Sequence, residues 1–432
     1  MSLGKSTLLV MASRILVLFA GLVVSVVAAH SLSSEEQGYF FTFISIAAAQ
    51  TLFELGITNL ILHHLSHACA GILLAKDEFQ KRAAQNLAES TRAYSLRYFG
   101  RAAGLFLVLI GASGAHFFAW SQQSTQSIEW QLPWVLMVTG TALSLFNLNY
   151  YSYLEAFGRL NMSYRIRMTA TALLIVIFIT ATFSLGGLAC YALGLLVSNI
   201  YAFIALSRAS KNVNREFGLD GIYTPQPVNI GREQRKMAAS AVAGYITANS
   251  LTPYAFHFFG ATIAGQVGLT MSIFAAIAAV AMARTTAEAP SYGLLIASGN
   301  LTVLMSKFRK TLEFSVFLAL VLGLAAIAIR QIGLALLPKY EDRVMSLAGF
   351  VVVSLLIFSN VTLSVTSTVL RAFKTEQLMW PSIVAALLLI TSQLALALNP
   401  MVCLAVLAAF NGLVFLPFAW LRLTTQISAR NV

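Results

Sequence analysis

The sequence predicts an all-α integral membrane protein with about twelve transmembrane helices. Hydrophobic residues make up 58% of the chain and charged residues only 10%, with a mean hydropathy of +0.78. Soluble domains carry about one quarter charged residues. The apolar residues fall into long runs, each near the roughly 20 residues that a helix needs to cross the hydrocarbon core. The basic residues gather in every second loop between these runs.

Hydropathy divides the chain into twelve expected spans. The first run is longer than the roughly 7 to 15 residues of a signal-peptide core, so we interpret it as a membrane helix. The fifth and sixth runs are separated only by Gly186 and Gly187. The expected spans are 11–32, 39–62, 99–120, 133–157, 168–185, 187–206, 238–259, 265–285, 312–330, 344–369, 379–398 and 401–421.

The basic residues predict the orientation. All but three of the 28 lysines and arginines lie on the side that carries the N-terminus, and the exceptions are Arg330, Lys339 and Arg343. The positive-inside rule therefore predicts that both termini are cytoplasmic. This topology accounts for the net charge of +12, so nucleic-acid binding has no support.

The loops are short on the outer side and longer on the inner side. Ser34 and Gln37 predict a capping box, with Glu35 and Glu36 in the first turn of the second span. The functional alternative is an acidic catalytic pair of the kind that membrane glycosyltransferases use, but those enzymes need a larger loop to fold over a sugar. Residues 70–98 predict one or two amphipathic helices on the inner surface.

A polar segment divides the chain into two halves. We expect an N-terminal six-helix lobe over 1–210, a cytoplasmic linker over 211–237 and a C-terminal six-helix lobe over 238–432. The stretch GYFFTFISIAAA at 38–49 aligns with GLTMSIFAAIAA at 268–279. An even number of spans makes the halves parallel repeats, a design typical of transporters with a site at the repeat interface.

The chain offers no catalytic chemistry. Cys69, Cys190 and Cys403 are widely spaced and form neither a disulfide framework nor a metal site. We find no hydrolytic triad, metal-ligand cluster or phosphate-binding glycine loop in the sequence. We therefore predict a non-enzymatic transporter without a cofactor or a metal site, in which coupling to H⁺ or Na⁺ stays open.

Three stretches resemble a known family. Arg14 in the first span is followed by SEEQGYFFTFISI at 34–46 and FELGITNLILHHLSH at 53–67, and the second half opens with GATIAGQVGLTMSI at 260–273. These stretches resemble Wzx-type polysaccharide flippases of the multidrug, oligosaccharidyl-lipid and polysaccharide exporter superfamily. The resemblance extends over the whole chain in span count and two-lobed layout. It implies two six-helix lobes around a central cavity that opens alternately to each side of the bacterial inner membrane.

The resemblance also implies a substrate. Such a flippase moves undecaprenyl-pyrophosphate-linked oligosaccharide from the cytoplasmic to the periplasmic leaflet for O-antigen, capsule or exopolysaccharide synthesis. Expected partners are this substrate, membrane lipids and other membrane proteins of polysaccharide assembly. A cation-coupled multidrug antiporter of the same superfamily is the alternative. It would need carboxylates exposed in a lobe to bind ions and cationic drugs, and only Glu54 and Glu155 are available. A polymerase or glycosyltransferase would need a folded external loop.

Four expected spans carry polar residues at helical spacing, where residues i, i+4 and i+8 share a face. Lipid cannot be what these seams face. Each seam alone could be a helix contact, and His257 could be a core histidine, but the four together favour a cavity. The seams are Gln50, Glu54 and Thr58; Asn147, Tyr151 and Glu155; Tyr245, Asn249, Pro253 and His257; and Asn360, Ser364, Ser367 and Arg371. Pro253 predicts a kink in the third of them. The candidate substrate contacts among them are Asn147, Tyr151, Asn249, His257 and Asn360.

Glu54 and Arg14 are expected to pair between the first two spans, because either charge alone would cost about 2.5 to 3.5 kcal/mol in the membrane. The pair could be a static brace. It could also be a gate in which Glu54 takes up H⁺ or Na⁺, and Glu155 is the second candidate for this coupling.

Arg14, Arg284 and Arg371 lie at a similar expected depth on the cytoplasmic side. A pyrophosphate needs cationic partners in a region of low dielectric, and arginine grips phosphate oxygens in a fork. We expect these three residues to form a basic mouth that loads the headgroup. The alternative is that topology alone places arginines at inner helix ends.

Overall fold

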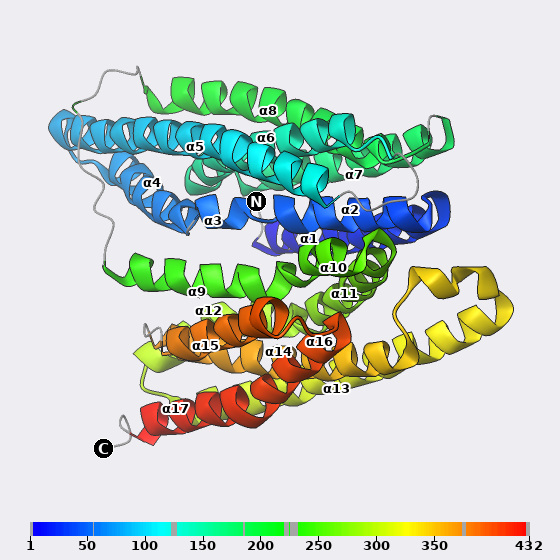
Figure 1. The fold of residues 1–432 in the computed structure, drawn as a ribbon. Coiled ribbons are helices and arrows are strands. Elements are labelled where there is room, and N and C mark those ends of the chain that lie inside the picture. Colours follow the sequence, from blue (N-terminus) through cyan, green and yellow to red (C-terminus); the bar gives the residue numbers. More distant parts are fainter. Residues whose placement is uncertain are drawn as a thin grey trace. The chain divides into compact units, whose positions relative to one another are not determined.

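The computed structural model describes residues 3–54, 56–121, 128–184, 186–219, 224, 232–373 and 377–428. Every regular element in these ranges is a helix (Figure 1). The α-helices are α1 (Leu3–Ser31), α2 (Ser34–Ala47), α3 (Gln50–Glu54), α4 (Ile57–Leu74), α5 (Glu78–Trp120), α6 (Gln131–Ala156), α7 (Leu160–Ser184), α8 (Ala189–Phe217), α9 (Arg232–Asn249), α10 (Leu251–Phe259), α11 (Ala261–Ala281), α12 (Ala283–Ala297), α13 (Leu301–Leu336), α14 (Leu347–Ala372), α15 (Met379–Ile390), α16 (Pro400–Phe410) and α17 (Leu416–Ser428). A 3₁₀-helix, η1 (Pro338–Arg343), and two π-helical turns, η2 (Thr391–Ala395) and η3 (Asn411–Phe415), complete the list.

Helix length and hydropathy confirm an all-α integral membrane protein with several spans. In the described ranges, nine helices are long and apolar enough to cross a membrane, and Phe19–Ser31 and Met379–Ala395 are shorter apolar helices. Helix α5 has 43 residues, or about 65 Å at 1.5 Å per residue, so it extends well beyond a hydrocarbon core of about 30 Å. Large apolar side chains such as Phe317 and Ile329 on α13 are exposed, as lipid-facing residues are.

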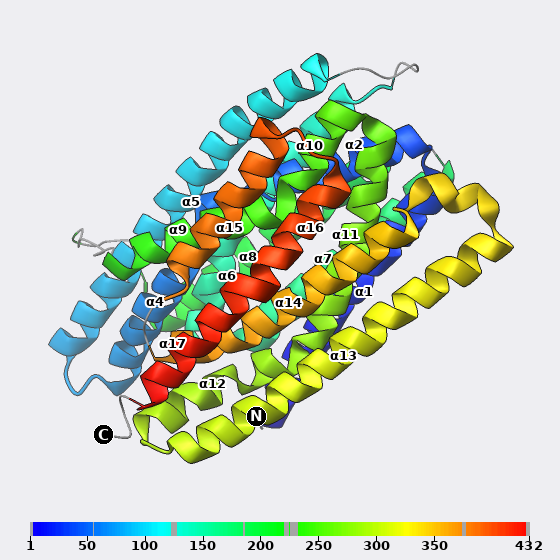
Figure 2. The ribbon, with the colours of Figure 1, turned by 60° about the horizontal axis from the view of Figure 1, so that its bottom comes forward.

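The helices form two compact units. Unit 1 holds residues 1–32 and 46–234, and unit 2 holds residues 33–45 and 235–432. In unit 1, α6 packs against α4, α5, α7 and α8, and in unit 2, α14 packs against α11, α12, α13, α16 and α17. Figure 2 shows α13 running beside α14. These two central helices correspond to the fourth and tenth expected spans. The expected lobe limits of 1–210 and 238–432 stay a prediction.

The predicted capping box is displaced by one residue. Ser33 Oγ accepts a hydrogen bond from the Glu36 N–H at 3.1 Å, and a Glu36 carboxylate oxygen accepts from the Ser33 N–H at 2.7 Å. Ser33 is therefore the cap, where we expected Ser34. Gln37 is buried instead, and its side-chain amide donates to the carbonyls of Gly265 and Arg343, both at 2.9 Å.

Glycines allow α2 to approach α11 closely within unit 2. A Cβ added to Gly38 would lie 1.9 Å from the Ala261 carbonyl oxygen, and one added to Gly268 would lie 2.2 Å from Phe41 Cβ. Small residues serve this purpose at helix contacts in membranes. Gly38 and Gly268 are the first residues of the two stretches, 38–49 and 268–279, that align between the halves of the sequence.

Several expected spans are interrupted. The second divides into α2, α3 and α4, and Gly56, with φ of 73°, adopts the left-handed conformation at the start of α4. The seventh divides into α9 and α10 at Ser250. Conversely, the expected surface helices over 70–98 are the end of α4 and the first turns of one continuous α5, which Asp77 caps by accepting from the Gln80 N–H at 2.7 Å.

The range 211–237 that we expected as a linker is partly helical, and its limits as a linker stay a prediction. Helix α8 continues to Phe217 and α9 begins at Arg232, so helix covers both ends of the range 211–237. Thr224 is held against α5, because its N–H donates to the Asn86 side-chain oxygen at 2.6 Å. Residues 220–223 and 225–231 of this range lie outside the described residues.

Candidate functional site

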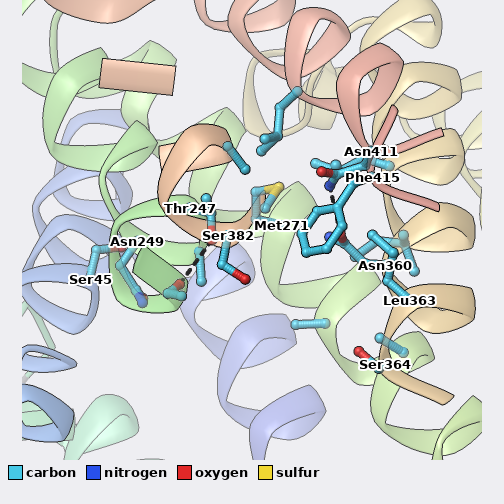
Figure 3. Close-up of a pocket in the computed structure, with 18 of the residues that line it drawn as sticks. Ser45, Thr247, Asn249, Met271, Asn360, Leu363, Ser364, Ser382, Asn411 and Phe415 are labelled. Carbon is cyan, nitrogen blue, oxygen red and sulfur yellow. Dashed lines mark hydrogen bonds between the residues drawn. The ribbon is translucent and has the colours of Figure 1, made fainter. Parts of the chain in front are cut away.

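Unit 2 contains a cavity of about 630 Å³ (Figure 3). Its lining comes mainly from α2, α9, α11, α14, α15 and the π-helical turn η3. The polar lining residues are Ser45, Ser240, Thr247, Asn249, Thr252, Ser272, Asn360, Ser364, Ser367, Arg371, Ser382 and Asn411. Polar groups are costly in a membrane-spanning bundle unless they meet partners or water. Their concentration around one cavity marks it as the candidate binding site.

An asparagine pair forms one wall of this cavity. Asn411 Nδ2 donates to Asn360 Oδ1 at 2.9 Å, as Figure 3 shows. Asn411 is 5% exposed, and its Oδ1 has no hydrogen-bond partner among the described residues. A buried amide oxygen without a donor is costly, so this atom is an acceptor poised for a ligand hydroxyl or N–H. The predicted contact Asn360 lines the cavity.

The backbone at Asn411 is also irregular. Asn411 begins η3, and π-helical turns inside α-helices frequently mark functional sites. Pro417 follows two residues after η3 and has no N–H for the Leu413 carbonyl. The missing backbone hydrogen bond at Pro417 lies next to the wider π-helical turn η3, in which Asn411 lines the cavity.

The opposite wall contains a broken helix. Asn249, at the end of α9, and Ser45 lie on the other side of the cavity from the asparagine pair (Figure 3). The Tyr245 hydroxyl donates to the Ser45 carbonyl at 3.3 Å, which ties α9 to α2. Pro253, in the first turn of α10, has no N–H for the Asn249 carbonyl. The predicted kink at Pro253 is thus a break at Ser250, and Asn249 lines the cavity as expected.

Arg371 is the one charged side chain among the described residues that line the cavity. It is exposed at the end of α14. Arg284, also expected at the basic mouth, is not among the lining residues, and its guanidinium lies 5.3 Å from the centre of the Phe314 ring. His257 also lies outside the lining, with its ring edge-to-face against Phe258.

A charged cluster outside the cavity joins α12 to α13. Lys307 Nζ donates to a Glu288 carboxylate oxygen at 3.0 Å, and the Ser291 hydroxyl donates to the same oxygen at 3.1 Å. The hydrogen bond from Lys307, with a smaller contribution from Ser291, holds the pKa of Glu288 below its usual range. Helix α12 is outside the nine candidate spans.

The polar seam predicted on α6, Asn147, Tyr151 and Glu155, contacts neighbouring helices of unit 1. Asn147 is fully buried, and its Nδ2 donates to the Asn199 carbonyl on α8 at 3.0 Å. Tyr151 is mostly buried beneath the Arg167 guanidinium, which lies 4.0 Å from the ring centre. Arg167 also donates to Glu155 at 3.3 Å. Glu155 therefore has a cationic partner on α7, and the roles predicted for this seam stay predictions.

Glu54 ends the five-residue helix α3, two positions before the left-handed Gly56 that precedes α4. Its side chain is half-buried. Arg14 lies on α1, but its side chain is outside the described residues, so the pair and the gate remain predictions.

Sequence reasoning missed Asn411 and Ser382. Both are single polar residues in strongly apolar runs, and no second polar residue at i+4 marks a seam. The available signal was Asn411-Gly412 followed by Pro417, a combination that disturbs a membrane helix.

Comparison with protein families finds no matching family, and comparison with curated proteins finds no match. Solved structures do match. A multidrug resistance MATE family transporter of the MOP superfamily, in its outward-facing conformation, has a TM-score of 0.60 at 14% identity, over 99% of this chain and 96% of that one. A MATE transporter from Vibrio cholerae also has a TM-score of 0.60 at 14% identity, over 98% and 96%.

A third match is a MOP superfamily transporter from Pyrococcus furiosus, described as having a binding pocket of reverse polarity that suggests a different function. Its TM-score is 0.55 at 15% identity, over 98% of this chain and 95% of that one. At such low identity these likenesses establish the fold. The chain has the two-lobed helical fold of these transporters.

Proposed function

We propose that the protein is a non-enzymatic transporter of the bacterial inner membrane, with both termini cytoplasmic, that works by alternating access. The observation that carries this proposal is the polar cavity of unit 2 inside an otherwise apolar helical bundle. The shared fold supports it, since solved structures of MATE transporters include outward-facing and inward-facing conformations.

Two of the similar structures are described as multidrug resistance transporters. This favours the alternative expectation, a cation-coupled multidrug antiporter. In this function the cavity holds an organic cation, and H⁺ or Na⁺ returns in exchange. No acidic side chain is among the described lining residues. The cation is therefore held by amide and hydroxyl oxygens, the ring faces of Phe41 and Phe415, and the polarizable sulfur of Met271.

A flippase for undecaprenyl-pyrophosphate-linked oligosaccharide is the second candidate, and the lining chemistry favours it. Amides and hydroxyls such as Asn360, Asn411 and Ser382 suit sugar hydroxyls, and Arg371 suits a phosphate oxygen. The Pyrococcus furiosus transporter, with its reversed pocket polarity, is a precedent for another substrate on this fold. Other membrane proteins of polysaccharide assembly would then be partners.

Expression in two bacterial strains tests the proposal. One strain lacks its own drug-efflux pumps, and the other lacks a polysaccharide flippase. An antiporter raises the drug concentration that the first strain tolerates. A flippase restores surface polysaccharide in the second. If a well-expressed, correctly inserted protein does neither, the proposed transport function is wrong.

Matched variants connect the result to the cavity. Arg371→Gln removes the charge from the lining, and Arg309→Gln removes an exposed charge of the same unit whose side chain pairs with Glu313 at 2.8 Å. We expect Arg371→Gln to abolish polysaccharide restoration but to leave drug tolerance intact, because a cationic drug gains nothing from an arginine. Arg309→Gln should resemble the wild type in both strains. Full transport by Glu54→Gln would remove the gate hypothesis.

A further inference from the structure

A second cavity, of about 530 Å³, lies within unit 1 between α3 and α5. Its lining residues are Leu52, Phe53, Tyr94, Arg97, Tyr98, Arg101, Ala102 and Leu105. The transport proposal uses none of them. The cavity has a rigid wall, because the Tyr98 hydroxyl donates to the Phe53 carbonyl at 2.9 Å and the Phe53 ring packs edge-to-face on Phe106 at 5.5 Å.

Two arginines stand one turn apart on the α5 side of this cavity. Arg97 and Arg101 are both exposed, and neither forms an ion pair with a carboxylate in the described part of the chain. Like charges at i and i+4 destabilise a helix. Arg97 Nε donates to the Ala93 carbonyl at 3.2 Å. This hydrogen bond holds the guanidinium at its Nε atom and leaves the two terminal nitrogens for another acceptor. The pair is thus arranged to receive an anion.

The cavity changes character along α5. At its polar end the rings of Tyr94 and Tyr98 stack, with their centres 6.2 Å apart, and Leu105 lies at its apolar end. These ends are about 16 Å apart along the helix. Arg101 is the last charged residue of α5, since residues 102–120 contain no Asp, Glu, Lys or Arg. Tyrosines and arginines collect at the level of lipid headgroups, and uncharged segments lie among acyl chains. The cavity therefore crosses from the headgroup level into the hydrocarbon.

We propose that this cavity binds an anionic membrane phospholipid, with its phosphate between Arg97 and Arg101 and an acyl chain along Ala102, Leu105 and Leu52. Guanidinium groups bind phosphate oxygens by charge-assisted hydrogen bonds in a fork. Basic pockets between membrane helices recognise anionic headgroups in the same way. A free phosphate would satisfy the arginines but would leave the apolar end of the cavity empty. The proposal is independent of the transported substrate.

The test is a lipid titration of the purified full-length protein in detergent, followed by native mass spectrometry. Phosphatidylglycerol, phosphatidylcholine and inorganic phosphate are titrated separately. The wild type should bind phosphatidylglycerol more tightly than either of the others. In Arg97→Gln with Arg101→Gln the affinity for phosphatidylglycerol should fall about 30-fold, from about 1 kcal/mol for each basic residue at 1.4 kcal/mol per tenfold change. Arg165→Gln with Arg208→Gln, at exposed arginines of α7 and α8 outside the cavity, also removes two charges. It is the charge-matched control and should keep the wild-type affinity.

Three results would overturn the proposal. One is an unchanged phosphatidylglycerol affinity in the double variant. The second is an equal loss in Arg165→Gln with Arg208→Gln, which would reduce the effect to net charge. The third is inorganic phosphate binding as tightly as the lipid, which would assign the site to a free anion. If the double variant is not recovered in folded form, the two single variants serve instead, because substitutions of exposed side chains are usually well tolerated. Each should lose about fivefold, and wild-type affinity in both overturns the proposal.

Discussion

Replacing Gly38 with alanine should destabilise unit 2, because it forces α2 away from α11. The added Cβ would lie 1.9 Å from the Ala261 carbonyl oxygen, where ordinary contact begins at 3.4 Å. That oxygen belongs to the backbone, so a helix must move rather than a side chain. A shift of about 1.5 Å also stretches the two 2.9 Å hydrogen bonds of the neighbouring Gln37 beyond useful range.

The magnitude follows from three contributions. Overpacking costs about 1 to 3 kcal/mol, and the two lost hydrogen bonds cost about 1 kcal/mol each. The gain in helix propensity from glycine to alanine offsets about 1 kcal/mol. The net loss of about 2 to 4 kcal/mol corresponds to a fall in Tm of roughly 5 to 15 °C for a unit of this size.

The assay is thermal unfolding of the purified protein, followed by size-exclusion fluorescence after heating. Gly333→Ala is the matched control, because a Cβ at Gly333 in α13 meets nothing within 4 Å. Its Tm should stay the same or rise slightly. A Tm for Gly38→Ala that equals the wild-type value would refute the close approach of α2 and α11.

Three further predictions concern named polar groups. Asn411→Leu removes the partner of Asn360 and should raise the KM for transport about tenfold, for a loss of about 1.4 kcal/mol, at normal expression. Glu288 has a lowered pKa, so its bond with Lys307 stabilises the fold above the ordinary carboxyl pKa and is lost as the pH falls through the lowered value. The Tm should therefore fall less between about pH 7 and pH 4 in Glu288→Gln than in the wild type. Glu155→Gln should retain transport and lose at most about 1 kcal/mol of stability, since its partly exposed carboxylate is held by a cation; a transport defect at full expression would restore Glu155 as a coupling residue.

Hydropathy predicted the membrane helices because burial in lipid acts on every residue of a span. The interruptions depend on single positions, and only the one near Pro253 was predicted, as a kink. Gly56 adopts a left-handed conformation, and Ser250 divides α9 from α10. The capping box was displaced because Ser33 and Ser34 are equivalent in the sequence, and only the burial of Gln37 against α11 decides between them.

The candidate site was predicted in part. Asn249, Asn360 and Arg371, from the predicted seams, line the unit 2 cavity, and their roles in substrate binding stay predictions. Asn147 makes a helix contact. Helical spacing identifies the polar face of a helix, but it cannot say whether that face meets a neighbouring carbonyl or a cavity. Such a distinction depends on tertiary packing, and so does the inclusion of residues 33–45 in unit 2.

Transport by the purified protein in proteoliposomes tests the central claim most directly. A fluorescent cationic drug and a defined lipid-linked oligosaccharide are offered in parallel, each with and without an imposed gradient of H⁺ or Na⁺. We predict movement of one of the two by the wild type and by Ser298→Ala, whose exposed side chain is outside the cavity, and loss of that movement in Asn360→Leu with Asn411→Leu. Movement of neither substrate, or undiminished movement in the double variant, would contradict transport through the unit 2 cavity.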